Sequence, residues 1–337
     1  MAFELSIITG RQVHDVVNAD VPQCIEVVKA AYLAHGAGET VNPPSHFLRF
    51  PDKPSSRIIA LPASLGPTAG VAGIKWIASY PENIAHGFPR ASAVLVLNDY
   101  TTGYPFAVLE SSIISAARTA ASAVLGAQWL NGGRTQTDTV GIVGTGLIAR
   151  YVYRYLLAAG WTADRLRLFD QNPAEAHAFA AATVQPDAHH SVTVCDDLPS
   201  LLQASSLVVL TTTAGRPHIL DPQLLAHAPI VLHLSLRDLS PEIIASAENI
   251  VDDVDHVMKA DTSLHLLEQA VGHRQFVTGT LAELMTGECQ LRRTSPAIFS
   301  PFGLGILDLA VGQWVYQRVT AAGDDLRLSD FFYELTR

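Results

Sequence analysis

The stretch VGIVGTGLIAR, residues 140–150, decides the fold of this chain. It opens with an apolar run of strand type, Gly144 and Gly146 follow, and the next residues are apolar at helical spacing. The order of strand, glycine turn and helix matches the pattern GxGxxA, with Ala149 in the last place. In this pattern the first glycine permits a tight turn, the second lets a pyrophosphate approach the backbone, and the third small residue lets helix and strand pack closely. The stretch therefore predicts a dinucleotide site at a helix N-terminus.

An acidic residue ends the next apolar run and supports this interpretation. The run RLRLFD ends at Asp170, 24 residues beyond Gly146. A carboxylate at this place hydrogen-bonds the ribose 2′-OH and repels a 2′-phosphate, which favours NAD over NADP. The alternative is a tight turn beside a solvated aspartate. The residues that we assign to the NAD site are Gly144, Thr145, Gly146, Leu147, Ile148, Asp170 and Thr212.

The patterns on the two sides of this motif differ. From the motif onward strand and helix patterns alternate, which predicts a parallel sheet with helices on both faces. Before it, short apolar runs at 57–63, 70–78 and 91–99 predict a small sheet, preceded by a helix at 21–35. An Ala-rich helix at 111–130 is expected to lead from one part to the other.

We therefore expect an α/β protein of two domains. A Rossmann-type parallel sheet domain occupies 118–303, and a smaller, discontinuous α+β domain occupies 1–117 with 304–337, because the last helical stretch, 305–321, is expected to pack back on the first strands. The length of 337 residues agrees, since single cores usually stop growing at about 250 residues.

Composition excludes several classes of protein. The formal net charge of -10 leaves no basic stripe for nucleic acid, and no apolar run reaches the roughly 18 residues that span a bilayer. The first residues lack the basic flank of a signal peptide, and the three cysteines form no CxxC pair. The thirteen histidines show no ligand spacing, so we assign no metal. We expect a cytoplasmic protein without a nucleic-acid or membrane partner.

Two cationic residues stand in apolar surroundings. Arg118 is the only charged residue between Glu110 and Arg134, and a buried guanidinium needs an anion. It is either a structural partner of Glu110 or Asp308, or a clamp for a substrate carboxylate. Lys75 lies in the middle of the run GVAGIKWIA. Taken alone, a lysine on an edge strand facing solvent is the simpler interpretation, and a lysine pointing into a polar cleft is the alternative.

Four further residues are candidates for chemistry or substrate binding. Asp238 follows the apolar run IVLHLSL, and ligands of parallel sheets bind just beyond the carboxyl ends of the strands. It is a candidate general acid and base, and the alternative is an aspartate that caps a helix or pairs with Arg237. Arg49, Arg57 and Arg90 fall on or beside the short strands of the first domain. Together they suit a multiply anionic substrate, although any one of them taken singly is more simply a surface arginine.

These residues together resemble the ornithine cyclodeaminase and mu-crystallin family, along nearly the whole chain. The motifs that carry the resemblance are GIKWIASYPEN, LNDYTTGYPFAVLESSIISAARTAA, VGIVGTG, LRLFDQNP and the segment around Asp238. The resemblance implies that Lys75 and Arg118 hold the α-carboxylate of an amino acid, and that Asp238 is the acid and base acting on an imine or its water. It also implies a homodimer joined through the sheets of the first domain, which is then the substrate-binding and dimerisation domain.

Within that family, the segments SHFLRFPDKPSSRIIALPA, ENIAHGFPRASAVLVLND and HLSLRDLSPEII resemble the branch of N-(2-amino-2-carboxyethyl)-L-glutamate dehydrogenases of siderophore biosynthesis. The cyclodeaminase pattern has a threonine in place of Arg90 and glycines in place of Leu236 and Arg237. The extra positive charge suits a substrate with three carboxylates, which Arg90 and Arg49 would help to bind. The resemblance thus implies oxidative cleavage of this substrate to 2,3-diaminopropionate and 2-oxoglutarate with NAD. The alternatives are an ornithine cyclodeaminase, a ketimine reductase or amino-acid dehydrogenase, and a non-catalytic dinucleotide-binding regulatory protein.

Overall fold

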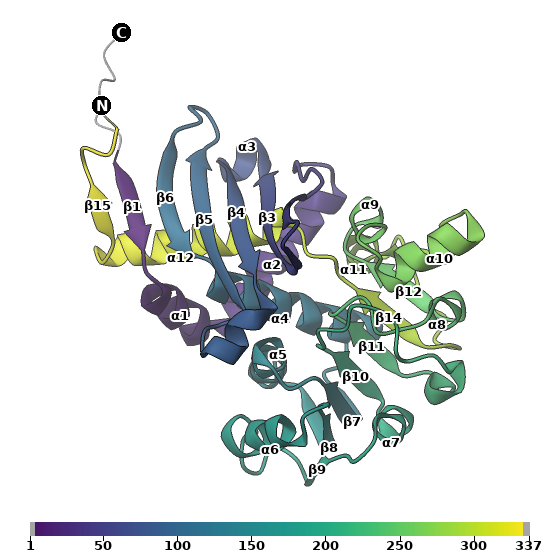
Figure 1. Cartoon of the computed structure of the whole chain (residues 1–337). Coiled ribbons are helices and arrows are strands. Elements are labelled where there is room, and N and C mark those ends of the chain that lie inside the picture. The colour runs from purple at the N-terminus through teal and green to yellow at the C-terminus, as the bar shows by residue number, and fades with distance from the viewer. Residues whose placement is uncertain (1–3, 333–337) are drawn as a thin grey trace. The chain divides into compact units, whose positions relative to one another are not determined.

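The computed structural model describes residues 4–332, and the chain divides into two compact units. Unit 1 comprises the residues up to Arg118 and the segment from Leu304 on, and unit 2 is Thr119–Gly303. Each unit is built on its own sheet (Figure 1). Within residues 4–332 no helix combines the length and the apolar character that crossing a bilayer requires.

Unit 1 contains a seven-stranded sheet with the strand order β15-β1-β6-β5-β4-β3-β2. Its neighbouring strands are antiparallel except for β1 and β6, which are parallel. The strands are β1 (Leu5–Ile8), β2 (His46–Phe50), β3 (Lys53–Ser64), β4 (Val71–Ser79), β5 (Ala91–Asp99), β6 (Pro105–Glu110) and β15 (Leu326–Leu328). The helices are α1 (Gly10–Ala19), α2 (Val21–Gly36), α3 (Gly66–Ala69), the 3-10 turn η1 (Pro81–His86) and α12 (Gly305–Ala322).

Helix α12 covers one face of this sheet, as the sequence predicts for the last helical stretch. It packs against β3, β4 and β5, and α2 packs against it in turn. The contact is close at Gly73, where an added Cβ would lie 2.9 Å from Cδ2 of Leu309 on α12. Because side chains alternate along a strand, Lys75 and Ser79 lie on the same, covered face as Gly73, and Trp76 lies on the other face.

Unit 2 contains an eight-stranded, fully parallel sheet with the order β13-β12-β14-β11-β10-β7-β8-β9. The strands are β7 (Gln136–Val143), β8 (Thr162–Phe169), β9 (Ser191–Val194), β10 (Leu207–Leu210), β11 (Ile230–His233), β12 (Glu248–Val251), β13 (Val277–Thr280) and β14 (Ala297–Ser300). The helices are α5 (Leu147–Ala158), α6 (Pro173–Ala182), α7 (Leu198–Ala204), η2 (Pro222–Leu225), α8 (Pro241–Ala245), α9 (Val254–Val257), α10 (Ser263–Val271) and α11 (Leu281–Thr286). Helix α4 (Ser112–Leu130) carries the chain from unit 1 into unit 2.

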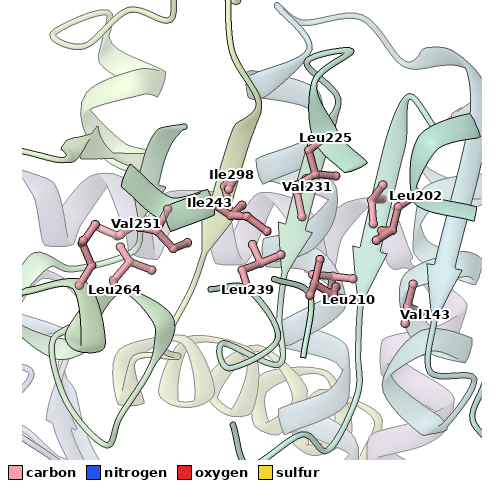
Figure 2. Close-up of a cluster of buried hydrophobic side chains, with 14 of the residues drawn as sticks. Val143, Leu202, Leu210, Leu225, Val231, Leu239, Ile243, Val251, Leu264 and Ile298 are labelled. Carbon is pink, nitrogen blue, oxygen red and sulfur yellow. The ribbon is translucent and has the colours of Figure 1, made fainter. Parts of the chain in front are cut away.

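Helices lie on both faces of the parallel sheet, with α5 and α6 on one side and α7 and α8 on the other (Figure 1). Between the sheet and α7 and α8 lies a core of buried aliphatic side chains, among them Leu210, Val231 and Ile243 (Figure 2). The strands of this core read as unbroken apolar runs, because a parallel sheet is covered on both faces. The expected Rossmann-type fold is thereby confirmed.

The strand order reverses between β7 and β10. From β7 the chain proceeds outward to β8 and β9, and it then returns to the other side of β7 to form β10 and β11. In open parallel sheets the ligand binds beyond the carboxyl ends of the strands at this reversal. A ligand site is therefore expected at the segments that follow β7, β8, β10 and β11.

Candidate active site

The turn after β7 is built around Gly144. Its φ of +81° lies in the left-handed region, and an added Cβ would lie 3.0 Å from the carbonyl oxygen of Thr211. Both facts exclude a side chain here. Gly146 then begins helix α5 without any side-chain capping bond, and Gly146 and Leu147 are exposed. The first amides of α5 are therefore available to an anion such as a pyrophosphate.

Asp170, directly after β8, is tied to this turn. Its Oδ2 accepts hydrogen bonds from the backbone N of Thr145 at 2.8 Å and from Oγ1 of Thr145 at 2.9 Å. Its Oδ1 accepts from the backbone N of Asn172 at 3.0 Å. The carboxylate thus shapes the glycine turn and also lies where a Rossmann fold binds the ribose hydroxyls. The alternative of a merely solvated aspartate does not describe this residue.

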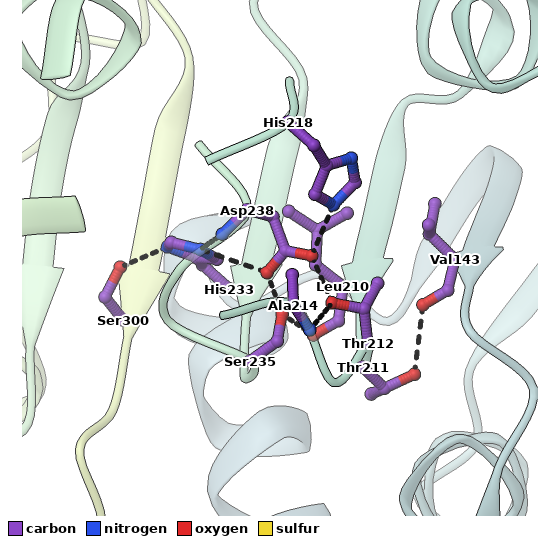
Figure 3. Close-up of polar contacts among 10 residues, drawn as sticks. All are labelled: Val143, Leu210, Thr211, Thr212, Ala214, His218, His233, Ser235, Asp238 and Ser300. Carbon is purple, nitrogen blue, oxygen red and sulfur yellow. Dashed lines mark hydrogen bonds and ion pairs between the residues drawn. The ribbon is translucent and has the colours of Figure 1, made fainter. Parts of the chain in front are cut away.

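Asp238 lies in the loop after β11 and is fully buried. Its Oδ1 accepts hydrogen bonds from Oγ1 of Thr212 and from Nε2 of His218, the latter at 3.0 Å, and its Oδ2 accepts from Oγ of Ser235 (Figure 3). The backbone N of Asp238 donates to Nε2 of His233 at 3.2 Å. Asp238 is thus the centre of a hydrogen-bonded cluster.

Neither structural alternative for Asp238 is correct. Helix α8 is capped by Ser240, whose side chain accepts from the backbone N of Ile243. Arg237 donates from Nε and Nη2 to the carbonyl oxygen of Ala260, at 3.1 and 2.6 Å. The preceding residue, Leu236, has a φ of +68°, so the loop that presents Asp238 is held in a conformation that side chains rarely adopt.

The surroundings of Asp238 keep it ionised. Burial by itself raises the pKa of this carboxyl, but the contacts with His218, His233 and Ser235 outweigh burial and hold the pKa below its ordinary value. Thr212 links the cluster to the glycine turn, because its neighbour Thr211 donates from Oγ1 to the carbonyl oxygen of Gly144 at 2.7 Å. The ionised carboxylate therefore lies beside the predicted dinucleotide site, within unit 2.

In unit 1, Lys75 and Arg118 share one buried carboxylate. Nζ of Lys75 lies 2.6 Å from Oδ2 of Asp308 and 3.3 Å from Oγ of Ser115, and Nε of Arg118 lies 3.4 Å from Oδ1 of Asp308. Asp308 is fully buried on α12. Of the two structural partners considered for Arg118, Asp308 is the one that the structure shows. Glu110 instead accepts hydrogen bonds from the first residues of α4, at Ser112 and Ile113.

The interpretation of Lys75 as a solvent-facing lysine on an edge strand is wrong. Its strand, β4, lies between β5 and β3, and the residue is only 2% exposed. The strand is interior because it pairs with both of its sequence neighbours, β3 and β5, an arrangement that the residues around Lys75 do not show by themselves. Burial lowers the pKa of Lys75 to about 8, against the raising effect of Asp308 and together with the lowering effect of Arg118. A single carboxylate does not offset the burial of this ammonium group.

Three arginines lie on or beside the strands near Ser79, and one of them, Arg90, contacts it. Arg49 on β2 lies directly opposite Arg57 on β3, and Arg57 lies opposite Ser79 on β4. Arg90, just before β5, donates from Nη1 to Oγ of Ser79 at 2.8 Å. Burial lowers the pKa of the Arg90 guanidinium. Arg49 is exposed and lies over the ring of Phe47. The strand register thus places Arg57 between Arg49 and Ser79, and Arg90 reaches Ser79 from the other side.

Two residues of this site, His218 and His233, were not predicted from the sequence. His218 and His233 both contact Asp238, but they come from different segments and have no regular spacing to it. The observation that could have pointed to them is their position, since His233 is the last residue of β11 and His218 follows β10, and the carboxyl ends of these strands meet at the predicted site.

The comparisons with known proteins identify the family to which the chain is similar. The model of the ornithine cyclodeaminase/mu-crystallin family matches residues 7–323. The chain is 27% identical to the N-((2S)-2-amino-2-carboxyethyl)-L-glutamate dehydrogenase of Staphylococcus aureus, over 87% of this chain and 89% of that one.

Two solved structures share the fold along nearly the whole chain. One is the Δ1-pyrroline-2-carboxylate reductase of Thermococcus litoralis with NADH and L-proline, at a TM-score of 0.86 and 20% identity, covering 95% of this chain and 99% of that one. The other is an archaeal alanine dehydrogenase dimer with bound NAD, at a TM-score of 0.85 and 23% identity, covering 98% and 100%. This chain belongs to the ornithine cyclodeaminase/mu-crystallin family.

Proposed function

We propose that the protein catalyses the oxidative cleavage of N-(2-amino-2-carboxyethyl)-L-glutamate to 2,3-diaminopropionate and 2-oxoglutarate, with reduction of NAD. It is an NAD-dependent oxidoreductase that acts on the CH–NH group of an amino acid. The observation that carries the choice of substrate is the cationic face of the unit 1 sheet, with Lys75 on β4 and Arg57 and Arg90 around Ser79. The relative from Staphylococcus aureus, which is named for this substrate, supports the same choice.

The glycine turn and Asp170 are the residues that hold NAD in this proposal. The free amides at the start of α5 receive the pyrophosphate, and Asp170 receives the adenosine ribose. Bound NAD supplies the acceptor for the hydride that leaves the glutamate α-carbon. The Asp238 cluster, on the β10 and β11 side of the glycine turn, provides the groups for proton transfer.

Lys75 and Arg118 bind the α-carboxylate of the substrate in this proposal. Burial of the ammonium group is only partly offset by Asp308, which is why the pKa of Lys75 is lowered to about 8. A second carboxylate beside it would favour the charged form and gain charge-assisted hydrogen bonds. Arg90, with Arg49 and Arg57, binds the remaining carboxylates. Fixing three carboxylates orients the reacting carbon, which is a large source of rate enhancement.

The direct test is an assay of the purified protein with NAD and N-(2-amino-2-carboxyethyl)-L-glutamate. We expect NADH and 2-oxoglutarate in equal amounts, and no comparable turnover of L-ornithine, L-alanine or L-proline. Proline formed from ornithine without net NADH would identify a cyclodeaminase instead. NADH formed from alanine or proline would identify a simpler amino-acid dehydrogenase or an imine reductase working in reverse. NAD binding without turnover of any of these substrates would favour a regulatory role.

We also propose a homodimer that forms through the unit 1 sheet. The face opposite α12 carries Trp76 on β4 directly beside Val94 on β5, and these side chains are 45% and 43% exposed. Ile74 and Val96 continue the same face. An apolar sheet face of this kind is typical of a subunit interface. The dimeric state of the alanine dehydrogenase with the same fold supports this arrangement.

A further inference from the structure

His218 is held against Asp238 by three contacts. Its backbone N and that of Ile219 donate to the carbonyl oxygen of Asp238, at 3.0 and 2.9 Å. Its ring Nε2 lies 3.0 Å from Oδ1 of Asp238. Main chain and side chain are thus fixed together, so the orientation of the imidazole is determined by the fold.

Asp238 itself is poorly suited to carry a proton. It is fully buried, and its two oxygens already accept hydrogen bonds from Thr212, His218 and Ser235. A carboxylate offers about four acceptor positions, so most of them are occupied. The same contacts hold the carboxyl pKa below the range in which a group exchanges protons at neutral pH.

The imidazole of His218 has the properties that Asp238 lacks. Its side chain is 32% exposed. With Nε2 donating to an ionised carboxylate, the lone pair is on Nδ1, and Nδ1 points away from Asp238 (Figure 3). Among residues 4–332 no group hydrogen-bonds to Nδ1. A carboxylate that fixes the tautomer of a partly exposed histidine is the arrangement of Asp and His in hydrolytic triads.

The His218–Asp238 pair also lies close to the predicted dinucleotide site. Thr212 donates to Asp238, and its neighbour Thr211 donates to Gly144, so the pair lies next to the glycine turn. It lies on the β10 and β11 side of β7, whereas Asp170 lies on the β8 side. In a Rossmann fold the dinucleotide crosses the sheet at this reversal, so its two ends lie on opposite sides of β7. Because Asp170 marks the adenosine side, His218 lies on the nicotinamide side.

We propose that His218 carries the proton in the hydrolysis of the imine and that Asp238 is its positioning residue. This inference rests on the proposed function and refines the expectation that Asp238 itself is the acid and base.

After hydride loss, the nitrogen lone pair has formed a C=N bond, giving a protonated imine. Water attacks the imine carbon while Nδ1 of His218 takes one of its protons, which gives a neutral carbinolamine. The imidazolium then returns this proton to the amine nitrogen. The C–N bond breaks with its electrons going to nitrogen, and the carbinol oxygen forms the ketone as its proton passes to His218 and then to solvent. The products are 2-oxoglutarate and the free amine, with one proton released.

Two variants and one control test this assignment. His218→Gln keeps a donor toward Asp238 but cannot carry a proton, and His218→Ala leaves a space that free imidazole can enter. His227→Gln is the matched control, because His227 is, like His218, an exposed histidine of the same unit, and its Nε2 lies 2.9 Å from the carbonyl oxygen of Ser205. The wild-type assay is run first, and absence of NADH formation there would refute the proposed function rather than this inference.

The assay separates hydride transfer from hydrolysis. Rapid mixing with substrate should give both His218 variants a first burst of NADH equal to the number of sites, while release of 2-oxoglutarate slows by about 100-fold to 10,000-fold. Added imidazole should restore release in His218→Ala and not in His218→Gln. The inference is overturned if His218→Gln releases 2-oxoglutarate at a near-wild-type rate. It is also overturned if the burst and the NAD affinity measured by calorimetry are lost together, since that pattern indicates a structural role.

Discussion

Single residues at this site owe their properties to contacts that are distant in the sequence. Asp238 could be identified from the sequence because it follows an apolar strand, and strand ends carry ligands in parallel sheets. His218 lies 20 residues earlier and meets Asp238 only because β10 and β11 are neighbours. Likewise, Lys75 and Asp308 are separated by 233 positions. Local patterns predict that such residues are unusual, but not which partner fixes their charge.

Replacing Asp170 with asparagine should narrow the preference for NAD over NADP. Asp170→Asn keeps an oxygen that accepts from the backbone N of Thr145, so the glycine turn is retained while the negative charge is removed. Since like charges repel, loss of that charge should improve NADP binding relative to NAD by about tenfold, or about 1.4 kcal/mol. Fluorescence titration with both dinucleotides measures this ratio. Asp164→Ala, an exposed change on the same strand, should leave it unaltered, and an unchanged ratio in Asp170→Asn would refute the assignment.

The lowered pKa of Lys75 predicts how anion binding depends on pH. The protonated form of Lys75 attracts a carboxylate, so the affinity for 2-oxoglutarate should be greatest below the pKa of about 8 and fall as the pH rises through it. Calorimetry of the NAD-loaded protein from about pH 6.5 to about pH 9.5 measures this affinity. The carboxyl groups of 2-oxoglutarate stay ionised over that range, so they do not contribute to the change. Lys75→Met should bind more weakly, with no such decline. If the affinity of Lys75→Met for 2-oxoglutarate fell by the same factor as the pH rises, Lys75 would not be part of the anion site.

Elements were predictable from the sequence where their pattern is local. The run before Gly144, the helix after it, the strands β3 to β5 and the last helix follow from apolar spacing and turn residues. Helix α1 was missed, although Thr9 and Gln12 form a capping box that marks its start. The strand order of the first sheet could not be predicted, because β1 pairs with β6 and β15 across long stretches of chain. Strand β4 is interior for a local reason, because it pairs with its sequence neighbours β3 and β5, and α12 covers the face that carries Lys75.

The close packing of β4 predicts a large effect of a small change. An added Cβ at Gly73 would lie 2.1 Å from the carbonyl oxygen of Val96 on β5 and 2.9 Å from Leu309 on α12. A backbone oxygen cannot move aside alone, so Gly73→Ala must displace strand or helix. We expect the free energy of unfolding to fall by about 2 kcal/mol. Urea denaturation measures it, with Ala72→Ser on the opposite face as the control. An equal free energy of unfolding for Gly73→Ala and wild type would show that the space between β4, β5 and α12 can accept a methyl group.

At the scale of the whole molecule, the two faces of the unit 1 sheet carry different kinds of side chain. The face toward α12 carries Lys75, which contacts Asp308 of that helix, and the opposite face presents Trp76 and Val94. A sheet covered by helices on one face usually alternates apolar and polar residues. Here the outer face is apolar as well, although only 16% of the residues of the chain are charged and its net charge is -10. The interface between two copies that we propose accounts for this apolar face.

Placing a charge on the outer face should therefore separate the subunits without unfolding them. Trp76→Glu introduces a carboxylate next to Val94, and in a two-fold interface each copy contributes the same charge, so burial and repulsion both oppose association. Light scattering after size-exclusion chromatography should give the mass of a dimer for wild type and that of a monomer for Trp76→Glu, with circular dichroism unchanged. Val192→Glu is the control, because Val192 is a 42% exposed apolar residue on β9 of the other sheet, and it should leave the dimer intact. A monomeric wild type, or a Trp76→Glu variant that remains dimeric, would show that this face is not the interface.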